Sequence, residues 1–391
     1  MNVSNNLIAP CLLIFVMLAL ILFQSVFFKS DAVIFNDDMI VNSDISDRPD
    51  NPDSQDNQDI SGANSGKYII YNDIRYQPDK FFILVIISHI CVFLLPAVFY
   101  IKIRGEGYSK KLKLDLPKPR YISLAAFMFF ALIFGTVLIN SLIYYISGFS
   151  IAIGGTLINT GGNPIYDMGV LISFVFLPAV CEEFMFRSVL SAEYEKYGAL
   201  CAAIITSVAF AMSHFSLLLF PSYFFSAVIF YGLAKVTNCV VFPAILHAGY
   251  NIFNIYVWDK LAGVLKFEQN RFIFIFVIAV VFMFFVYLVF GRLESIYYYK
   301  AYANRINKIN EVVAENPQTR RMRNIRNLKK AKNIKNRGIV SEKNNINNTN
   351  NIGIIDITDG GGNFFIKFFR SFLSPTFIGA IIIFFVYIIA N

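Results

Sequence analysis

The chain has 391 residues, of which 56% are hydrophobic and 15% charged, and its formal net charge is +8. A soluble globular domain has about 45–50% apolar and about 25% charged residues, so this composition excludes an ordinary soluble protein. Runs of about 20 apolar residues recur, and in lipid such runs satisfy their backbone hydrogen bonds as helices. We therefore predict an all-α fold, a polytopic transmembrane helical bundle with about eight or nine membrane helices.

The N-terminal segment 1–28 holds the first apolar run, in which a helix is expected over 7–28. The run lacks basic residues at its start and is long for a signal peptide, so we interpret it as a membrane anchor. Residues 29–80 are polar and acidic, with SDISDRPDNPDSQDNQDISG at their centre. Low hydrophobicity and many acidic side chains predict a mostly disordered loop.

The remaining apolar runs predict helices at 81–101, 121–147, 167–197, 199–216, 217–236, 239–258, 272–291 and 375–390. They divide the rest of the chain into segments of different expected character. These are accessory transmembrane helices in 81–164, a core in 165–260, an eighth transmembrane helix in 261–291, a basic low-complexity segment in 292–374 and a C-terminal hydrophobic helix in 375–391.

Two segments outside the apolar runs are basic, namely 102–120 and 292–374, which contains TRRMRNIRNLKKAKNIKNRG. The positive-inside rule places both in the cytoplasm, with the N-terminus, and the acidic loop 29–80 outside. The longer basic segment has few interleaved aromatic residues, so we predict adsorption to anionic lipid and no nucleic-acid partner. The bias toward Asn, Ile, Lys and Phe is typical of an AT-rich genome and favours a bacterial cytoplasmic membrane.

Ionisable side chains occur inside the apolar runs, where they are costly and usually functional. In LPAVCEEFMFRSVL, Glu183 and Arg187 are four residues apart, which is the spacing of a helical ion pair. Such a pair leaves Glu182 unexplained, because it points about 100° away around the helix. His89 stands alone in its run, and we interpret it as a packed or hydrogen-bonded helix residue.

Three further polar side chains are expected at the depth of Glu182. His214 follows the turn residue Gly198 by 16 positions and Glu182 precedes it by 16, so antiparallel helices would bring them level. His247 and Asn251 are four residues apart on one helical face. The rise per residue places Glu182 and His247 roughly 12–15 Å below the cytoplasmic boundary. We therefore predict one shared site.

The chemistry of this set is that of amide hydrolysis. A carboxylate beside an imidazole can deprotonate water, and a second imidazole with a carboxamide can stabilise the oxyanion that forms. Zinc is the other option, because two histidines and a glutamate can bind it with one position open for water. The candidate ligands are Glu182, His214 and His247, and the sequence leaves metal activation and direct activation open.

Three short motifs occur in order over about 165–260, and they resemble those of the CPBP family of intramembrane proteases. That family takes in the Rce1-like type II CAAX prenyl endopeptidases and their bacterial relatives. The motifs are E-E-x-x-x-R at Glu182, Glu183 and Arg187, F-x-x-x-H at Phe210 and His214, and H-x-x-x-N at His247 and Asn251.

The resemblance implies an intramembrane endopeptidase, often described as a metalloprotease, that cleaves a peptide bond near the cytoplasmic membrane face. It implies that Glu182 and His214 activate the water and that His247 and Asn251 bind the oxyanion. Glu183 and Arg187 would order the site. The expected substrate is a membrane protein or a lipid-modified peptide, in CAAX-type processing or in a bacterial processing or immunity role.

Two alternatives from other functional classes stay open. A membrane transporter or proton-relay protein can use a buried Glu/His cluster, although many transporters show internal repeats and none is visible here. A non-catalytic membrane scaffold can keep the same residues for stability. Exchange of Glu182 for Gln distinguishes the scaffold, because its cellular function would survive the change.

Overall fold

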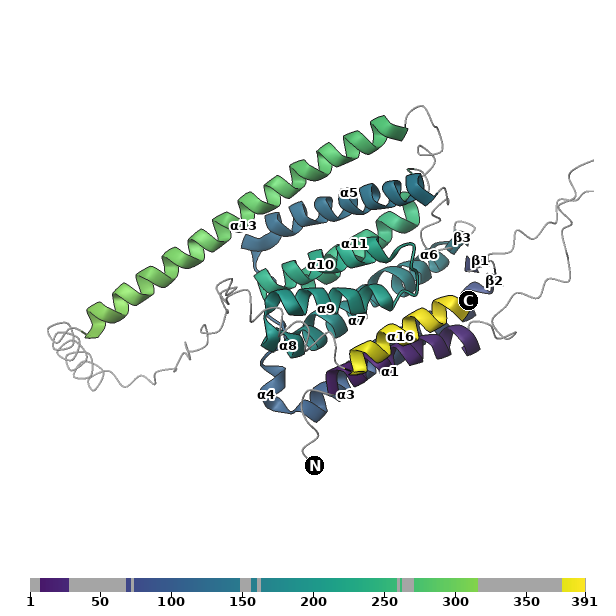
Figure 1. Cartoon of the computed structure of the whole chain (residues 1–391), viewed down its shortest axis with the longest axis horizontal. Helices are drawn as coiled ribbons and strands as arrows, with labels where there is room; N and C mark the ends of the chain where they lie inside the picture. The colour runs from purple at the N-terminus through teal and green to yellow at the C-terminus, as the bar shows by residue number, and fades with distance from the viewer. Residues whose placement is uncertain are drawn as a thin grey trace, which may run out of the picture.

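The computed structural model describes residues 8–27, 68–71, 74–147, 156–159, 163–258, 261, 271–315 and 375–390. In this part of the chain the fold is a bundle of long helices packed side by side, with a small sheet at one end (Figure 1). The predicted helical class is confirmed. Most of the expected acidic loop 29–80 and of the basic segment 292–374 lies outside the described residues.

Four helices in the described ranges are long and apolar enough to cross a membrane: Pro78–Arg104, Pro119–Ser147, Pro164–Tyr197 and Arg271–Asn307. Shorter apolar helices cover Cys11–Ser25, Ala199–Met212 and Phe377–Ile389. The chain is therefore an integral membrane protein, as predicted. A total of eight or nine membrane helices stays a prediction.

The N-terminal helix and the first two spans each follow a predicted apolar run closely. Helix α1 (Ile8–Leu22) continues through a π-helical stretch to Phe27. Helices α2 (Pro78–His89) and α3 (Leu95–Arg104) form one span, joined by π-helical residues Ile90–Leu94, and short α4 (Glu106–Ser109) follows. After a 3₁₀ turn at Pro119–Tyr121, α5 covers Ile122–Ser147.

The span that carries the two adjacent glutamates is a single helix with two π-helical stretches. Helices α6 (Pro164–Val170), α7 (Leu177–Glu183) and α8 (Ser191–Tyr194) follow one another, with π-helical residues at Leu171–Phe176 and Phe184–Leu190. The first stretch comes directly before the Leu177–Pro178 step, where proline removes a backbone amide. Gly198, with a φ of 108°, makes the turn into α9 (Ala199–Met212), which confirms the predicted turn.

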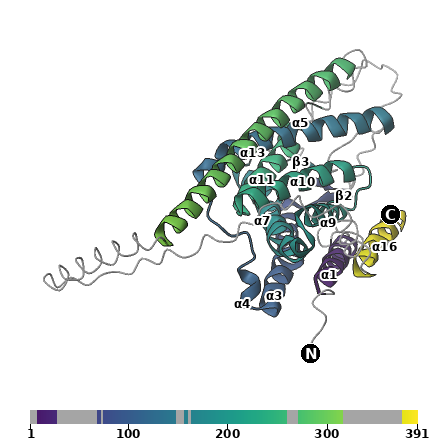
Figure 2. The same cartoon turned by 60° about the vertical axis from the view of Figure 1, so that its left-hand side comes forward.

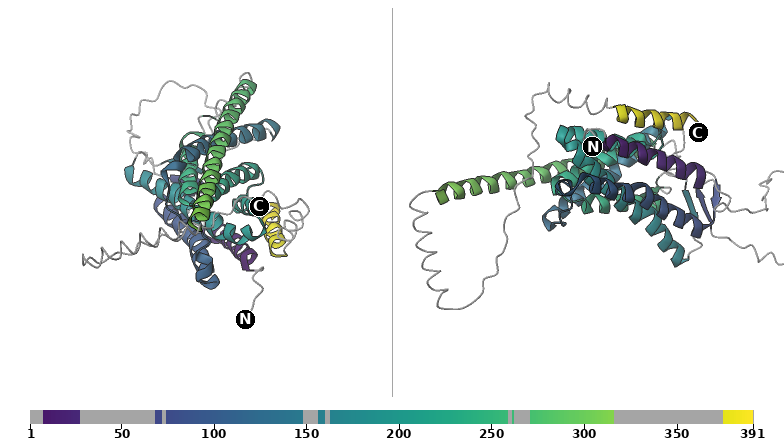
Figure 3. Two further views of the ribbon diagram at one scale, coloured as in Figure 1. Left: turned by 90° about the vertical axis from the view of Figure 1, so that its left-hand side faces the viewer. Right: turned by 90° about the horizontal axis from the view of Figure 1, so that it is seen from below.

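The C-terminal half adds α10 (Phe220–Thr237), α11 (Val241–Tyr256), α13 (Arg271–Glu315) and α16 (Pro375–Ala390). The predicted end of the α13 helix at residue 291 is wrong, because the helix continues to Glu315. Residues 292–315 contain no Gly or Pro to stop it, and Pro317 is the second residue after Glu315. The extension projects beyond the rest of the bundle (Figure 3).

A small antiparallel sheet accompanies the helices that make up most of the described residues. Strands β1 (Tyr68–Tyr71) and β2 (Ile74–Tyr76) lie within the expected acidic loop, and β3 (Thr156–Asn159) follows α5. Strand β1 pairs with both neighbours, in the order β2-β1-β3. Apolar residues alternate too briefly in such short strands to predict them, and pairing with a distant strand is what satisfies their backbone groups.

The first and last helices of the described chain pack against each other. Helix α13 packs along α5, while α10 contacts both α5 and α9 (Figure 2). On the opposite side of the bundle α1 and α16 lie side by side, although they come from opposite ends of the chain (Figure 1). Helix α7 lies between α2 and α11, and this arrangement encloses the polar residues described next.

Candidate active site

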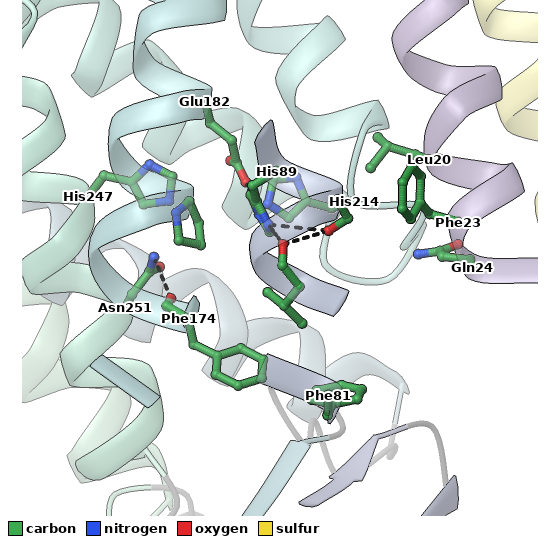
Figure 4. Close-up of a pocket in the computed structure, with 13 residues that line it drawn as sticks. Leu20, Phe23, Gln24, Phe81, His89, Phe174, Glu182, His214, His247 and Asn251 are labelled. Atoms are coloured by element: carbon green, nitrogen blue, oxygen red, sulfur yellow. Dashed lines mark hydrogen bonds and ion pairs between the residues drawn. The ribbon is translucent and has the colours of Figure 1, made fainter. Parts of the chain in front are cut away.

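The predicted site residues come from three separate stretches of the bundle. Glu182 and Glu183 end α7, Arg187 lies in the following π-helical stretch, and His214 lies in the turn after α9. Helix α11 supplies His247 and Asn251. The structure brings four of these side chains to one cavity, with a volume of about 260 Å³ (Figure 4), namely Glu182, His214, His247 and Asn251.

Glu183 and Arg187 are fully buried beside this cavity. Arg187 Nε lies 3.0 Å from Glu183 Oε2, so the two form the i,i+4 ion pair expected from their spacing. The guanidinium carbon lies 4.8 Å from the ring centre of Phe210 and 5.7 Å from that of Phe230. A buried charge pair is stable only when further contacts compensate for lost hydration, and the two aromatic faces provide such contacts.

His247 is held by the same carboxylate. Its Nδ1 lies 3.2 Å from Glu183 Oε1, and its ring stacks on Phe230 at 5.1 Å between ring centres. A carboxylate only accepts hydrogen bonds, so Nδ1 carries the proton and donates it. Glu183 thereby fixes Arg187 with one oxygen and His247 with the other.

His214 has its own anchor in the turn after α9. Its Nδ1 lies 2.9 Å from the carbonyl oxygen of Phe210, and its ring stacks on Tyr223 at 4.0 Å between ring centres. Because a carbonyl only accepts, Nδ1 carries the proton and Nε2 of the neutral ring keeps a lone pair. The predicted helix over 199–216 is too long, since α9 ends at Met212 and Phe215 has a positive φ of 48°.

Glu182 is the carboxylate that reaches the cavity. It is 6% exposed, and its Oε2 is buried with no hydrogen-bond partner among the described side chains. A buried carboxylate oxygen without a partner is costly, and water occupies cavities that are polar and large enough to hold it. The cavity is therefore suited to place water against Glu182.

Asn251 is held in the site by a backbone carbonyl that Pro178 leaves without an amide partner. Pro178 has no amide hydrogen for the carbonyl of Phe174 four residues earlier. Asn251 Nδ2 donates to that carbonyl oxygen at 3.2 Å (Figure 4). Pro243 has no comparable effect on the site, because it lies in the first turn of α11 and the Cys239 carbonyl accepts from the Thr237 hydroxyl.

The loop before α5 supports the Arg187 end of the site. Lys113 is 2% exposed, and its Nζ lies 2.8 Å from Glu195 Oε1 and donates to the carbonyl of Arg187 at 3.2 Å. Loss of hydration on burial lowers the pKa of Lys113, while the Glu195 carboxylate opposes that shift. This contact ties the loop to the helix that carries the adjacent glutamates.

Sequence reasoning missed His89 as a site residue. The structure confirms the expected hydrogen bond within its helix, yet His89 also lines the cavity and its Nε2 lies 3.5 Å from Glu182 Oε1. The available signal was its rarity, since the chain has three histidines and this one occupies a membrane helix.

The donor set was also tested against a metal. In the part of the chain that the structure describes, no three His, Cys, Asp or Glu side chains gather closely enough to bind an ion. Both His214 and His247 use Nδ1 for other contacts, which would leave Nε2 for a metal, but Glu182 faces His89 and the three side chains do not gather around one point. Glu182, His214 and His247 therefore do not fit a zinc site as they stand, and metal dependence stays an untested prediction.

The comparisons with known proteins agree with the motifs. Residues 164–253 match the family model described as type II CAAX prenyl endopeptidase Rce1-like. The match starts with α6 and ends in α11, so it contains the segment from Glu182 to Asn251. No curated protein and no solved structure shows a significant match. The predicted resemblance to the CPBP family, which takes in the Rce1-like endopeptidases, is thus confirmed for residues 164–253 of this chain.

Proposed function

We propose that this protein is an intramembrane endopeptidase in which Glu182 activates water for attack on a peptide bond. One observation carries the proposal: side chains from α7, from the turn after α9 and from α11 line a single cavity of about 260 Å³. The family of residues 164–253 supports the same class of reaction.

Glu182 is the proposed proton acceptor. The water oxygen bonds to the carbonyl carbon as its proton passes to the Glu182 carboxylate, and the carbon–nitrogen bond then breaks. The same proton leaves with the amine, so the carboxylate is restored and one water is consumed for each bond cleaved. His214 lies on the same cavity with a lone pair on Nε2, so it can accept a hydrogen bond from the attacking water.

Asn251 and His247 are the proposed stabilisers of the oxyanion. Asn251 Nδ2 has two N–H groups, and one of them is donated to Phe174, which leaves the other for the substrate oxygen. His247 can donate from Nε2 when its ring carries both protons, with Nδ1 held by Glu183. Glu183 and Arg187 have the role of holding these groups in place.

The proposed substrate is a membrane protein or a lipid-modified peptide whose cleavage point reaches the cavity from the cytoplasmic side. Basic residues that follow the span Pro78–Arg104 support this orientation by the positive-inside rule. A prenylated C-terminal motif is the substrate class that the family description suggests. Substrates of a bacterial processing or immunity pathway are also included in the proposal, because they would be cleaved at the same site.

A census of protein termini tests the proposed activity. Membranes from cells making wild-type protein are compared with membranes from cells making Glu182→Gln, both at equal expression and fold. Glu106→Gln is the matched control, because Glu106 is exposed and lies outside the cavity. We expect new termini with wild type and Glu106→Gln only. Identical termini in all three would overturn the proposal in favour of transport or a scaffold.

Treatment with a zinc chelator tests the metal prediction once a substrate is known. Because the donor set does not fit a metal, we expect cleavage by purified protein to survive exhaustive treatment with 1,10-phenanthroline. Loss of cleavage that added zinc restores would contradict this expectation and would make Glu182, His214 and His247 ligand candidates again.

A further inference from the structure

His89 contacts the proposed proton acceptor from outside the family domain. It ends helix α2, far in sequence from the matched residues 164–253. Its Nε2 lies 3.5 Å from Glu182 Oε1, and its ring lines the same cavity as His214, His247 and Asn251 (Figure 4). The oxygen that it faces is the neighbour of the unpartnered Oε2 of Glu182.

The ring of His89 is held in one orientation. Its Nδ1 lies 2.9 Å from the carbonyl oxygen of Val85 and 3.5 Å from Ser88 Oγ. The ring also packs beside Phe93, with 5.7 Å between ring centres. A carbonyl only accepts hydrogen bonds, so Nδ1 carries a proton and donates it. These contacts leave Nε2 as the ring atom that is directed at Glu182.

The contact between Nε2 and the carboxylate has a defined polarity. Two lone pairs facing each other at this distance in a site of low polarity would repel, whereas an N–H facing a carboxylate attracts it. Four other ionisable groups lie near enough to Glu182 to interact with it electrostatically. They are Cys181 of α7, Arg187 of the following π-helical stretch, His214 of the turn after α9 and His247 of α11. Among the described side chains, His89 is the one that lies within 4 Å of Glu182 as an ion-pair partner.

We propose that His89 is a positioning residue, which donates from Nε2 to Glu182 Oε1 and so holds the carboxylate in one orientation at the cavity. The inference rests on the proposed function and deepens it, because it adds an accessory helix to the catalytic arrangement. A carboxylate fixed by one oxygen presents the other in a constant direction, which lowers the reorganisation needed for proton transfer. The family domain would then depend on α2 to orient its glutamate.

Kinetics of purified variants on a substrate found in the terminus census test this role. His89→Leu removes the donor, and we expect kcat to fall by about tenfold to hundredfold, the range for loss of a hydrogen bond to a charged group, with KM little changed. His89→Gln keeps an N–H near the position of Nε2 and should restore most of kcat. Ile87→Ala is the control, because Ile87 lies on the same helix but is exposed and does not line the cavity. A kcat of His89→Leu equal to wild type would overturn the proposal, and so would failure of His89→Gln to exceed His89→Leu.

A second measurement is independent of proteolysis. The chain has three histidines, so ¹⁵N spectra of histidine-labelled protein contain three imidazole rings, and His89→Gln assigns one of them. We expect a protonated Nε2 for His89 and a clear shift of that signal in Glu182→Gln, with no shift in Glu106→Gln. A His89 signal that does not shift in Glu182→Gln would contradict the contact between these two side chains. Failure of the proposed function is seen separately, as the absence of termini that depend on the wild-type protein.

Discussion

Glu183 is the residue on which the geometry of the site depends most directly. Its two carboxylate oxygens contact Arg187 and His247, and both partners are buried with it. Ion pairs in the interior are weak contributors to net stability, but removal of one partner leaves an uncompensated charge. The pair therefore matters for the placement of His247 more than for the folding energy.

Variants of this pair separate stability from function. We expect Arg187→Met to lower the free energy of unfolding by about 3–5 kcal/mol, because the Glu183 charge loses its partner. The double variant Glu183→Gln/Arg187→Met should recover much of that loss. Its cleavage activity should stay low, since His247 no longer donates to a carboxylate. Thermal unfolding in detergent and cleavage rates measure the two effects, and recovery of both together would contradict the assigned role.

A second prediction concerns the proline that precedes the glutamates. Pro178→Ala supplies an amide hydrogen that can bind the Phe174 carbonyl within the helix, in competition with Asn251. We expect unchanged or higher thermal stability and about tenfold lower cleavage, because the Asn251 amide is no longer fixed. Asn251→Ala should add little to Pro178→Ala, since both act on one contact. Fully additive losses in the double variant would show that Pro178 acts by another route.

At the scale of whole elements, the N-terminal helix lines one wall of the cavity and the C-terminal helix α16 packs against that wall. Helix α1 contributes Leu20, Phe23 and Gln24 to the lining. Tyr387 of α16 donates to Gln24 Oε1 at 2.7 Å, and its ring lies 4.6 Å from that of Phe215 next to His214. Both helices lie outside residues 164–253, so this wall is an addition to the family domain.

Removal of the Tyr387 hydroxyl tests this wall. We expect Tyr387→Phe to raise KM by about twofold to tenfold at nearly constant kcat, which corresponds to the loss of one hydrogen bond that holds Gln24 at the cavity. Tyr302→Phe is the matched control, because Tyr302 is an exposed tyrosine on α13. A change in kcat without a change in KM would place the effect of Tyr387 on the chemistry and contradict a role in shaping the cavity.

At the scale of the molecule, the distribution of charge predicts which end of the bundle faces the cytoplasm. The span Pro78–Arg104 has 27 residues, about 40 Å of helix, which exceeds the hydrocarbon thickness of about 30 Å. Exposed lysines mark both of its ends, with Lys80 in its first turn and Lys110 just beyond its last. The sheet lies at the end where the span begins (Figure 1).

Thiol labelling of these two lysine positions gives the orientation. In a background without the native cysteines, we expect Lys80→Cys to react with a membrane-impermeant maleimide in intact cells. Lys110→Cys should react only after the membrane is opened, because Lys110 lies in the basic segment 102–120, which the positive-inside rule places in the cytoplasm. The opposite pattern would invert the topology and move the proposed site toward the outer face.

Much of the helical frame was predictable because membrane helices leave a local signal. The apolar runs at 81–101 and 121–147 match the observed spans to within a few residues, and Gly198 marks the turn that was expected there. The spacing of Glu183 and Arg187 likewise predicted their ion pair. Each of these features depends on residues close in sequence, where hydrophobicity, helical periodicity and turn chemistry act.

Contacts between distant segments left no such signal. The pairing of His89 with Glu182, the bond between Tyr387 and Gln24 and the sheet that joins β1 to β3 all link residues far apart in the chain. In lipid every helix presents a similar apolar surface, so hydrophobicity does not specify which helices become neighbours. Shape and a few polar contacts make that choice, and they exist only once the bundle has packed.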